Sequence, residues 1–218
     1  RGMQYDMTGA SVAVAVMYAF AALKKTPSFG IVVPLAQNSI SGYCTKVGDV
    51  MTSYSGKTVE MTNTDAEGRL ALADAITYAI KDLKVNSLAT IATLTGGVIV
   101  ALGDVFTAYW STNDKNAKAI KEIADLSGEY VWQFPFHNSI KKRVINKSVI
   151  ADYINSDESR QAQSIAGAEF LKLFTNGVDF MHFDIAGTNE IKLKDKTQPF
   201  PSLMYTLFNF VKENYNGK

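Results

Sequence analysis

The sequence predicts an α/β fold with a mostly parallel central sheet and helices on both faces. Short segments rich in β-branched residues alternate with longer segments of helical spacing, a pattern typical of parallel strands covered by helices. Hydrophobic residues make up 47% of the chain and charged residues 20%, as in ordinary folded proteins. No repeat, low-complexity tract or linker divides the chain, so we expect one domain over residues 1–218.

Helical spacing of apolar residues marks the predicted helices. The first begins at Thr8, in a small, apolar run that contains no glycine or proline after Gly9. This run favours a buried helix in which Thr8 caps the first turn, and residues 24–27 end it. The other predicted helices cover residues 68–82, 116–126, 161–174 and 202–211.

The predicted strands are short and bounded by turn residues. Segments 49–52 and 57–61 flank Ser55-Gly56 and indicate a hairpin. Apolar, β-branched runs indicate buried strands at residues 31–35, 87–93 and 178–185. Because ligand sites of open α/β sheets gather at the carboxyl ends of strands, we expect a site in the loops that follow three of these strands. These loops are residues 63–69, 94–97 and 186–189.

Charge and cysteine content argue against several classes of partner. A net charge of +1, from 22 Lys and Arg against 21 Asp and Glu, gives no field that would attract nucleic acid or an anionic membrane. The longest apolar stretches, residues 11–23 and 87–100, are shorter than the ~20 residues that span a bilayer. Cys44 is the one cysteine, so we interpret it as a structural or incidental thiol and expect a cytoplasmic protein.

Two carboxylates and a guanidinium stand within five positions of the segment 63–70, between a predicted strand and a predicted helix. Residues two apart in an extended loop project to the same side, so Asp65 and Glu67 are predicted to face one site, with Arg69 close by. Like charges this close favour a bound cation, and divalent ions accept carboxylate oxygens. The alternative is helix capping and interaction with the helix dipole.

The segment 63–70, read as NTDAEGRL, matches the signature octapeptide of the leucyl aminopeptidase family, the M17 metallopeptidases. Five further segments resemble family motifs in the same order along the chain. They are YDMTGA (5–10), SGYCTKVGDV (41–50), SGKTVE (55–60), ATLTG (92–96) and HFDIAG (182–187). The resemblance covers nearly the whole chain.

The resemblance implies a two-metal centre, usually zinc, with manganese, magnesium or cobalt as replacements. Glu67 would bridge the ions, Asp65 would bind one ion and Asp6 the other. By its position alone, Asp6 at a helix start is more typical of an N-cap. Arg69 matches the arginine that holds a bicarbonate as general base, and a guanidinium suits a planar oxyanion. Its alternative is a salt bridge to Asp65 or Glu67.

Substrate-binding positions are also implied by the resemblance. Leu94, Thr95 and the glycines after them match the loop that hydrogen-bonds the substrate backbone, and glycines permit close approach of a peptide. The positions that match the pocket for the first side chain, together with Asn63 of the octapeptide, are Met3, Asn63, Thr93, Gly96, Ala186 and Asn189.

In the family, a metal-binding lysine, a bridging aspartate and a second lysine stand shortly upstream of the D-M-x-G-A segment, after an N-terminal domain. These groups would precede Arg1, so we expect residues 1–218 to lack them. Asp6, Asp65 and Glu67 supply three negative charges against four positive charges of two divalent ions. We therefore expect weak metal binding and little activity from residues 1–218 alone.

The predicted function of the intact protein is removal of N-terminal residues from peptides, with a leucine-type preference, by a metal-activated water. The family implies a homohexamer. One alternative is a non-catalytic structural or assembly fragment of that hexamer. Another is a two-metal phosphoesterase, but such sites usually include histidine, and neither His137 nor His182 stands in a metal-ligand pair. We interpret His182, in a predicted strand, as a structural histidine.

Overall fold

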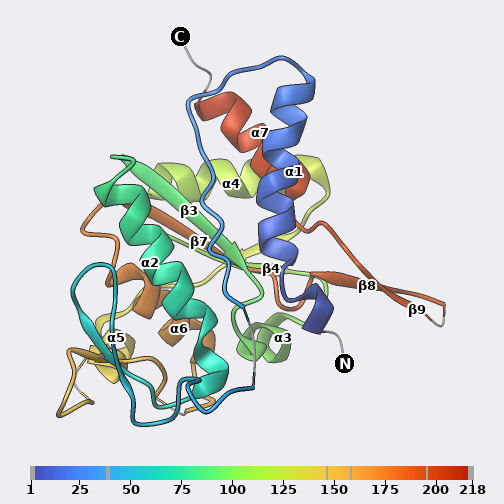
Figure 1. Cartoon of the computed structure of the whole chain (residues 1–218). Coiled ribbons are helices and arrows are strands. Elements are labelled where there is room, and N and C mark those ends of the chain that lie inside the picture. Colours follow the sequence, from blue (N-terminus) through green and yellow to red (C-terminus); the bar gives the residue numbers. More distant parts are fainter. Residues whose placement is uncertain (1–2, 38–39, 146, 158, 195, 216–218) are drawn as a thin grey trace. The chain divides into compact units, whose positions relative to one another are not determined.

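A computed structural model of the chain is shown in Figure 1. It describes residues 3–37, 40–145, 147–157, 159–194 and 196–215. The chain forms two compact units, each built from separate segments. Unit 1 comprises Arg1–Ile31, Ala89–Phe134 and Met181–Lys218, and unit 2 comprises Val32–Leu88 and Pro135–Phe180. The expectation of a single domain stays a prediction.

A four-stranded sheet lies largely in unit 1, in the order β3-β7-β4-β5. Its strands are β3 (Ser87–Ala92), β7 (Asp179–Asp184), β4 (Thr107–Ser111) and β5 (Val131–Gln133). β4 runs parallel to β5 but antiparallel to β7, with Tyr109 opposite Phe183. The α/β class is confirmed. The sheet is only partly parallel, because β7 inserts between β3 and β4, which follow each other along the chain.

Side chains alternate across this sheet, as the pleat requires. Tyr109, Met181 and Phe183 point to one face and join the buried cores of α4 (Asp114–Ser127) and α7 (Met204–Asn214). The buried residues of this core are Tyr109, Ala117, Ile120, Ile123, Ala124, Val131, Met181, Phe183, Ile185, Leu203 and Phe210. Apolar spacing along α4 and α7 thus produces the covered face that the sequence predicts.

The first helix, α1 (Thr8–Ala22), packs against α7 through Val12, Val16 and Phe20. The Phe20 ring stacks on Phe208 with centroids 4.5 Å apart. Figure 1 shows α7 beside both α1 and α4.

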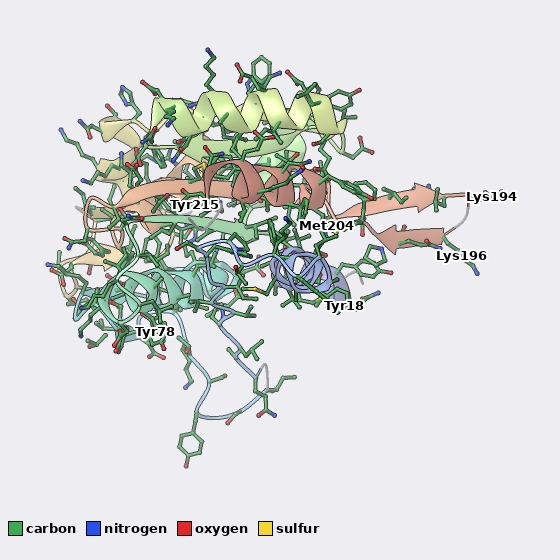
Figure 2. The ribbon with its side chains drawn as sticks, turned by 90° about the horizontal axis from the view of Figure 1, so that it is seen from above. Tyr18, Tyr78, Lys194, Lys196, Met204 and Tyr215 are labelled. Carbon is green, nitrogen blue, oxygen red and sulfur yellow. The ribbon has the colours of Figure 1, made fainter. Side chains whose placement is uncertain are left out.

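By length and composition alone, the stretch Met3–Ala22 is able to cross a membrane, at 20 residues and a mean hydropathy of 1.2. It includes the short 3-10 helix η1 (Met3–Tyr5). Only 28% of it is buried, and Tyr18 on its open side is 74% exposed (Figure 2). Because its other side packs in the core of unit 1, we interpret α1 as a core helix.

Two further pieces of unit 1 follow the sheet strands. The helix α3 (Gly96–Leu102) begins directly after the loop that follows β3. The strands β8 (Glu190–Leu193) and β9 (Lys196–Pro199) form an antiparallel hairpin, with Lys194 and Lys196 near its turn (Figure 2).

Unit 2 contains a small mixed sheet. β1 (Val50–Thr52) and β2 (Thr58–Glu60) form the predicted antiparallel hairpin, and β6 (Tyr153–Ile154) runs parallel to β2. The helices of this unit are α2 (Gly68–Lys81), α5 (Asn138–Ile145) and α6 (Gln163–Lys172), together with the 3-10 helix η2 (Thr64–Ala66).

Two local predictions are wrong. Residues 31–35, all of which the structure describes, are not part of a strand. They are half-buried or exposed, and Pro34 has no N–H for a ladder. Thr8 does not cap α1, because Met7 occupies the N-cap and makes no side-chain capping bond. The Thr8 hydroxyl instead donates to Tyr5 O at 2.6 Å.

The start of α1 presses against the end of β3 at Gly9. A Cβ on Gly9 would lie 2.1 Å from the main-chain oxygen of Ile91, a distance that real Cβ atoms do not reach. Glycine is therefore required for this close approach, which brings the residues before α1 to the carboxyl end of β3.

We expect Gly9→Ala to destabilise the protein by about 1–3 kcal/mol, because the overlap is with main chain and relief requires a backbone shift. Urea unfolding measures the change. Gly30→Ala is the matched control, since a Cβ there meets nothing within 4 Å. Equal midpoints for the two variants would contradict the close approach.

Candidate functional site

The octapeptide lies where two parallel strands of unit 2 end. We call residues 63–70 the carboxylate loop. The loop follows β2, passes through η2, and enters α2 at Gly68. Asp65 and Glu67 are exposed, whereas Arg69 is only 4% exposed. The sequence prediction that acidic groups gather between a strand and a helix is confirmed.

Neither carboxylate serves as the cap that the alternative interpretation required. The N-cap of η2 is Asn63, in extended backbone (φ −144°, ψ 115°), and its side-chain oxygen accepts from Asp65 N at 2.9 Å. Glu67 occupies the N-cap position of α2 but makes no side-chain capping bond. Capping is thus carried out by Asn63, which the sequence assigned to substrate binding.

A residue that the sequence analysis missed holds this loop. Asn155, directly after β6, is fully buried. Its side-chain oxygen accepts from Thr62 N (2.8 Å), Thr62 Oγ1 (3.0 Å) and Asn63 N (3.2 Å). Its side-chain nitrogen donates to Asn63 O (2.6 Å) and Ala66 O (3.2 Å).

Arg69 is fixed by the same residue. Its Nη1 donates to the main-chain oxygen of Asn155 at 2.8 Å, within the buried interior of unit 2. A guanidinium has its donors in one plane, so this contact helps to set the orientation of the whole group.

Asp6 lies in unit 1, just before α1. It is exposed, and its Oδ1 accepts a hydrogen bond of 2.5 Å from the hydroxyl of Thr93, which follows β3. The N-cap of α1 is Met7, so Asp6 does not have the capping role that its position alone suggested. The structure therefore brings together two predicted site residues, Asp6 and Thr93.

Asp184, at the end of β7, organises the loop after β3. Its carboxylate accepts from Leu94 N (3.0 Å), Thr95 Oγ1 (2.6 Å) and Ala186 N (3.2 Å). Burial raises the pKa of this carboxyl to about 6, and the hydrogen bonds from Thr95, Ala186 and Leu94 oppose the shift. The sequence analysis included Asp184 in a family motif but gave it no role.

The remaining predicted substrate residues are spread along unit 1. Gly96 is the first residue of α3, and Ala186 is half-buried. Asn189 is 9% exposed and accepts Phe200 N through its main-chain oxygen at 2.8 Å, whereas Met3 is 68% exposed.

His182 has the surroundings expected of a structural histidine. It is fully buried in β7, and its Nδ1 lies 2.9 Å from the hydroxyl of Thr90. Its ring stacks on Trp110 with centroids 5.4 Å apart.

The donor set fits a hard or borderline divalent ion, because Asp65 and Glu67 present exposed carboxylates two residues apart on one turn. Within the ranges that the structure describes, no three His, Cys, Asp or Glu side chains form a metal-binding group. Asp6 belongs to unit 1 and the other two carboxylates to unit 2. Convergence of the three therefore stays a prediction.

The raised pKa of Asp184 has a measurable effect on stability. The unfolded carboxyl ionises near 3.8 and the folded one near 6, so the folded state binds more protons between these values. Stability from this group is highest below pH 4 and falls as pH rises through 6. Relative to Asp184→Asn, wild type should lose roughly 3 kcal/mol between pH 4 and pH 7.

Urea unfolding of both proteins across this pH range measures the difference in the free energy of unfolding. A difference that stays constant, or that grows in favour of wild type with rising pH, would show that Asp184 is not a carboxyl with a raised pKa.

Comparison with known proteins gives one family. The profile of the cytosol aminopeptidase family, catalytic domain, matches residues 1–205. A probable cytosol aminopeptidase of Legionella pneumophila (strain Corby) is 42% identical over 208 residues, 94% of this chain and 42% of the relative. Its counterpart in Mycoplasma pneumoniae is 42% identical over 192 residues, 88% of this chain and 43% of the relative.

A solved structure of a tomato leucine aminopeptidase mutant matches with a TM-score of 0.86 and 35% identity, covering 94% of this chain and 40% of that one. This chain thus spans about two fifths of the length of these curated relatives (42% and 43%). Because the family profile extends over almost all of its residues, the chain belongs to the cytosol aminopeptidase family and corresponds to its catalytic domain.

Proposed function

We propose that this chain provides most of the catalytic domain of a metal-dependent aminopeptidase that removes N-terminal residues, with a leucine-type preference, from peptides. The observation that carries the proposal is the carboxylate loop. Asp65 and Glu67 are exposed on a turn whose main chain is held by buried groups, so their oxygens do not serve to build the turn. Family membership supports the same reaction class.

Asp6, Asp65 and Glu67 are the proposed ligands of two divalent ions, zinc or manganese, magnesium or cobalt. Such ions lower the pKa of a bound water from ~15.7 toward ~7 and so supply the nucleophile. Arg69 is proposed to hold a bicarbonate that accepts and returns the proton. The Asn155 main-chain oxygen would keep the guanidinium plane in place for that role.

The loop after β3 is proposed to bind the substrate backbone. Asp184 fixes Leu94 and Thr95 through a main-chain and a side-chain contact, leaving the carbonyl groups of this loop to a peptide. The pocket for the first side chain would include Met3, Asn63, Thr93, Gly96, Ala186 and Asn189. Its methionine and alanine suit an aliphatic side chain such as leucine.

Assembly and location follow from the family in this proposal. We expect the longer protein to form a homohexamer that acts on peptides in the cytoplasm, as the name of its relatives suggests.

Asp65→Asn and Glu67→Gln, made in the longer protein that contains this chain, should each lower kcat/KM for leucyl-p-nitroanilide by more than about 10²-fold, because each keeps volume but removes a metal ligand. Metal content after dialysis should fall in parallel, while thermal unfolding stays cooperative. The control is Glu122→Gln on α4, an exposed partner of Lys118. Wild-type turnover by either loop variant would mean that the ligands are misassigned.

Residues 1–218 tested alone should show little peptidase activity, even with excess zinc or manganese and bicarbonate. Three carboxylates leave one of four metal charges unbalanced, and the family's upstream lysine and aspartate groups would be missing. Loss of one oxyanion donor alone costs ~10²–10³ in rate. A side-by-side assay with a polypeptide extended through that segment, with metal content, tests this. Equal rates would show that Asp6, Asp65, Glu67 and Arg69 suffice; no activity in either would favour a purely structural role.

A further inference from the structure

We propose that Asn155 is a positioning residue for the carboxylate loop: its side-chain amide sets the direction in which the metal-ligand residues Asp65 and Glu67 point. This inference rests on the proposed aminopeptidase function. Asn155 touches no reacting atom in this account. It acts through the main chain of the loop, and every contact used in the argument lies within unit 2.

The position of Asn155 follows from the pairing of β6 with β2. The two strands are parallel with Glu60 opposite Ile154, so both chains leave the sheet at the same edge. Asn155 N donates to Glu60 O at 3.1 Å as the last bond between them. The next residues of β2 then run beside the Asn155 side chain, which is fully buried.

Both ends of the amide are needed here. The oxygen meets only donors, from Thr62 and Asn63, and the nitrogen meets the acceptors Asn63 O and Ala66 O. An aspartate of equal size would place an oxygen against two carbonyl oxygens, and alanine would leave buried main-chain groups without a partner. Asparagine is the small side chain that satisfies both sets.

The contacts lead directly to the acidic residues. Ala66, whose carbonyl accepts from Asn155, stands between Asp65 and Glu67 in sequence. Asn63, bound by Asn155 through both its N–H and its carbonyl, caps Asp65 N at 2.9 Å. Fixing these two points fixes the turn from which both carboxylates project.

A purely structural role would also make Asn155 important for stability, so stability does not decide between the two roles. Metal affinity of the folded protein does. A loop with correct main-chain direction presents its carboxylates to an ion without reorganisation, whereas a loosened loop must be ordered on binding. The positioning role therefore predicts a loss of metal affinity that persists where the protein is fully folded.

The main variant is Asn155→Asp, made in the longer protein. Mn²⁺ binding is followed by the EPR signal of the free ion, at a temperature where circular dichroism shows wild type and variant folded. We expect the Mn²⁺ dissociation constant to rise about 10–100-fold, with kcat falling more than KM changes.

Two further variants keep the test decisive. Thr62→Val keeps volume and removes only the hydroxyl that donates to Asn155 Oδ1 at 3.0 Å, so it should fold and weaken Mn²⁺ binding several-fold. Asn113→Ala is the matched structural control, since the Asn113 side chain caps α4 through Lys115 N and Asn116 N. It should lower the Tm and leave Mn²⁺ affinity unchanged.

The outcomes separate the two levels of the argument. A wild type that neither binds Mn²⁺ nor cleaves peptides would overturn the proposed function and this inference with it. A wild type that does both, alongside Asn155→Asp and Thr62→Val that bind Mn²⁺ equally well, would overturn the positioning role alone. If Asn155→Asp does not fold, Thr62→Val decides.

Discussion

Main-chain groups that leave a strand away from water must find partners, and this constraint determines how both parts of the candidate site are built. In unit 2 the partner is the amide of Asn155, which meets donors with its oxygen and acceptors with its nitrogen. In unit 1 it is the carboxylate of Asp184, which meets donors only. The chemical type of each buried side chain therefore matches the main-chain groups that the neighbouring loop presents.

The residues that hold the loops are different from the residues proposed to act. Asp65, Glu67 and Asp6 are exposed, and none of them caps the helix that it precedes. Asn63 and Asn155 form the turn instead. Carboxylates that are not committed to local structure keep their oxygens available for a cation, at the expense of mutual repulsion when no cation is bound.

Local pattern predicted the elements that have a strong apolar period, such as α2, α4 and α7. It failed at residues 31–35, because a β-branched run indicates burial and contains no information on a partner strand. The orientation of β7 was also beyond reach, since its place between β3 and β4 depends on non-local pairing. The acidic residues of the site were found from residue type and motif. Asn155 was not, because one asparagine after a two-residue strand forms no pattern.

The segmental composition of the two units has a consequence for folding during synthesis. Unit 1 joins the first residues of the chain to the last, as in the bond of 2.8 Å from Ser28 N to Tyr215 O. The apolar side of α1 therefore has no complete partner until α7 leaves the ribosome. Contacts between such distant residues slow folding and prolong exposure of apolar surface. Nascent chains of this protein are accordingly expected to depend on chaperones while the middle of the chain is made.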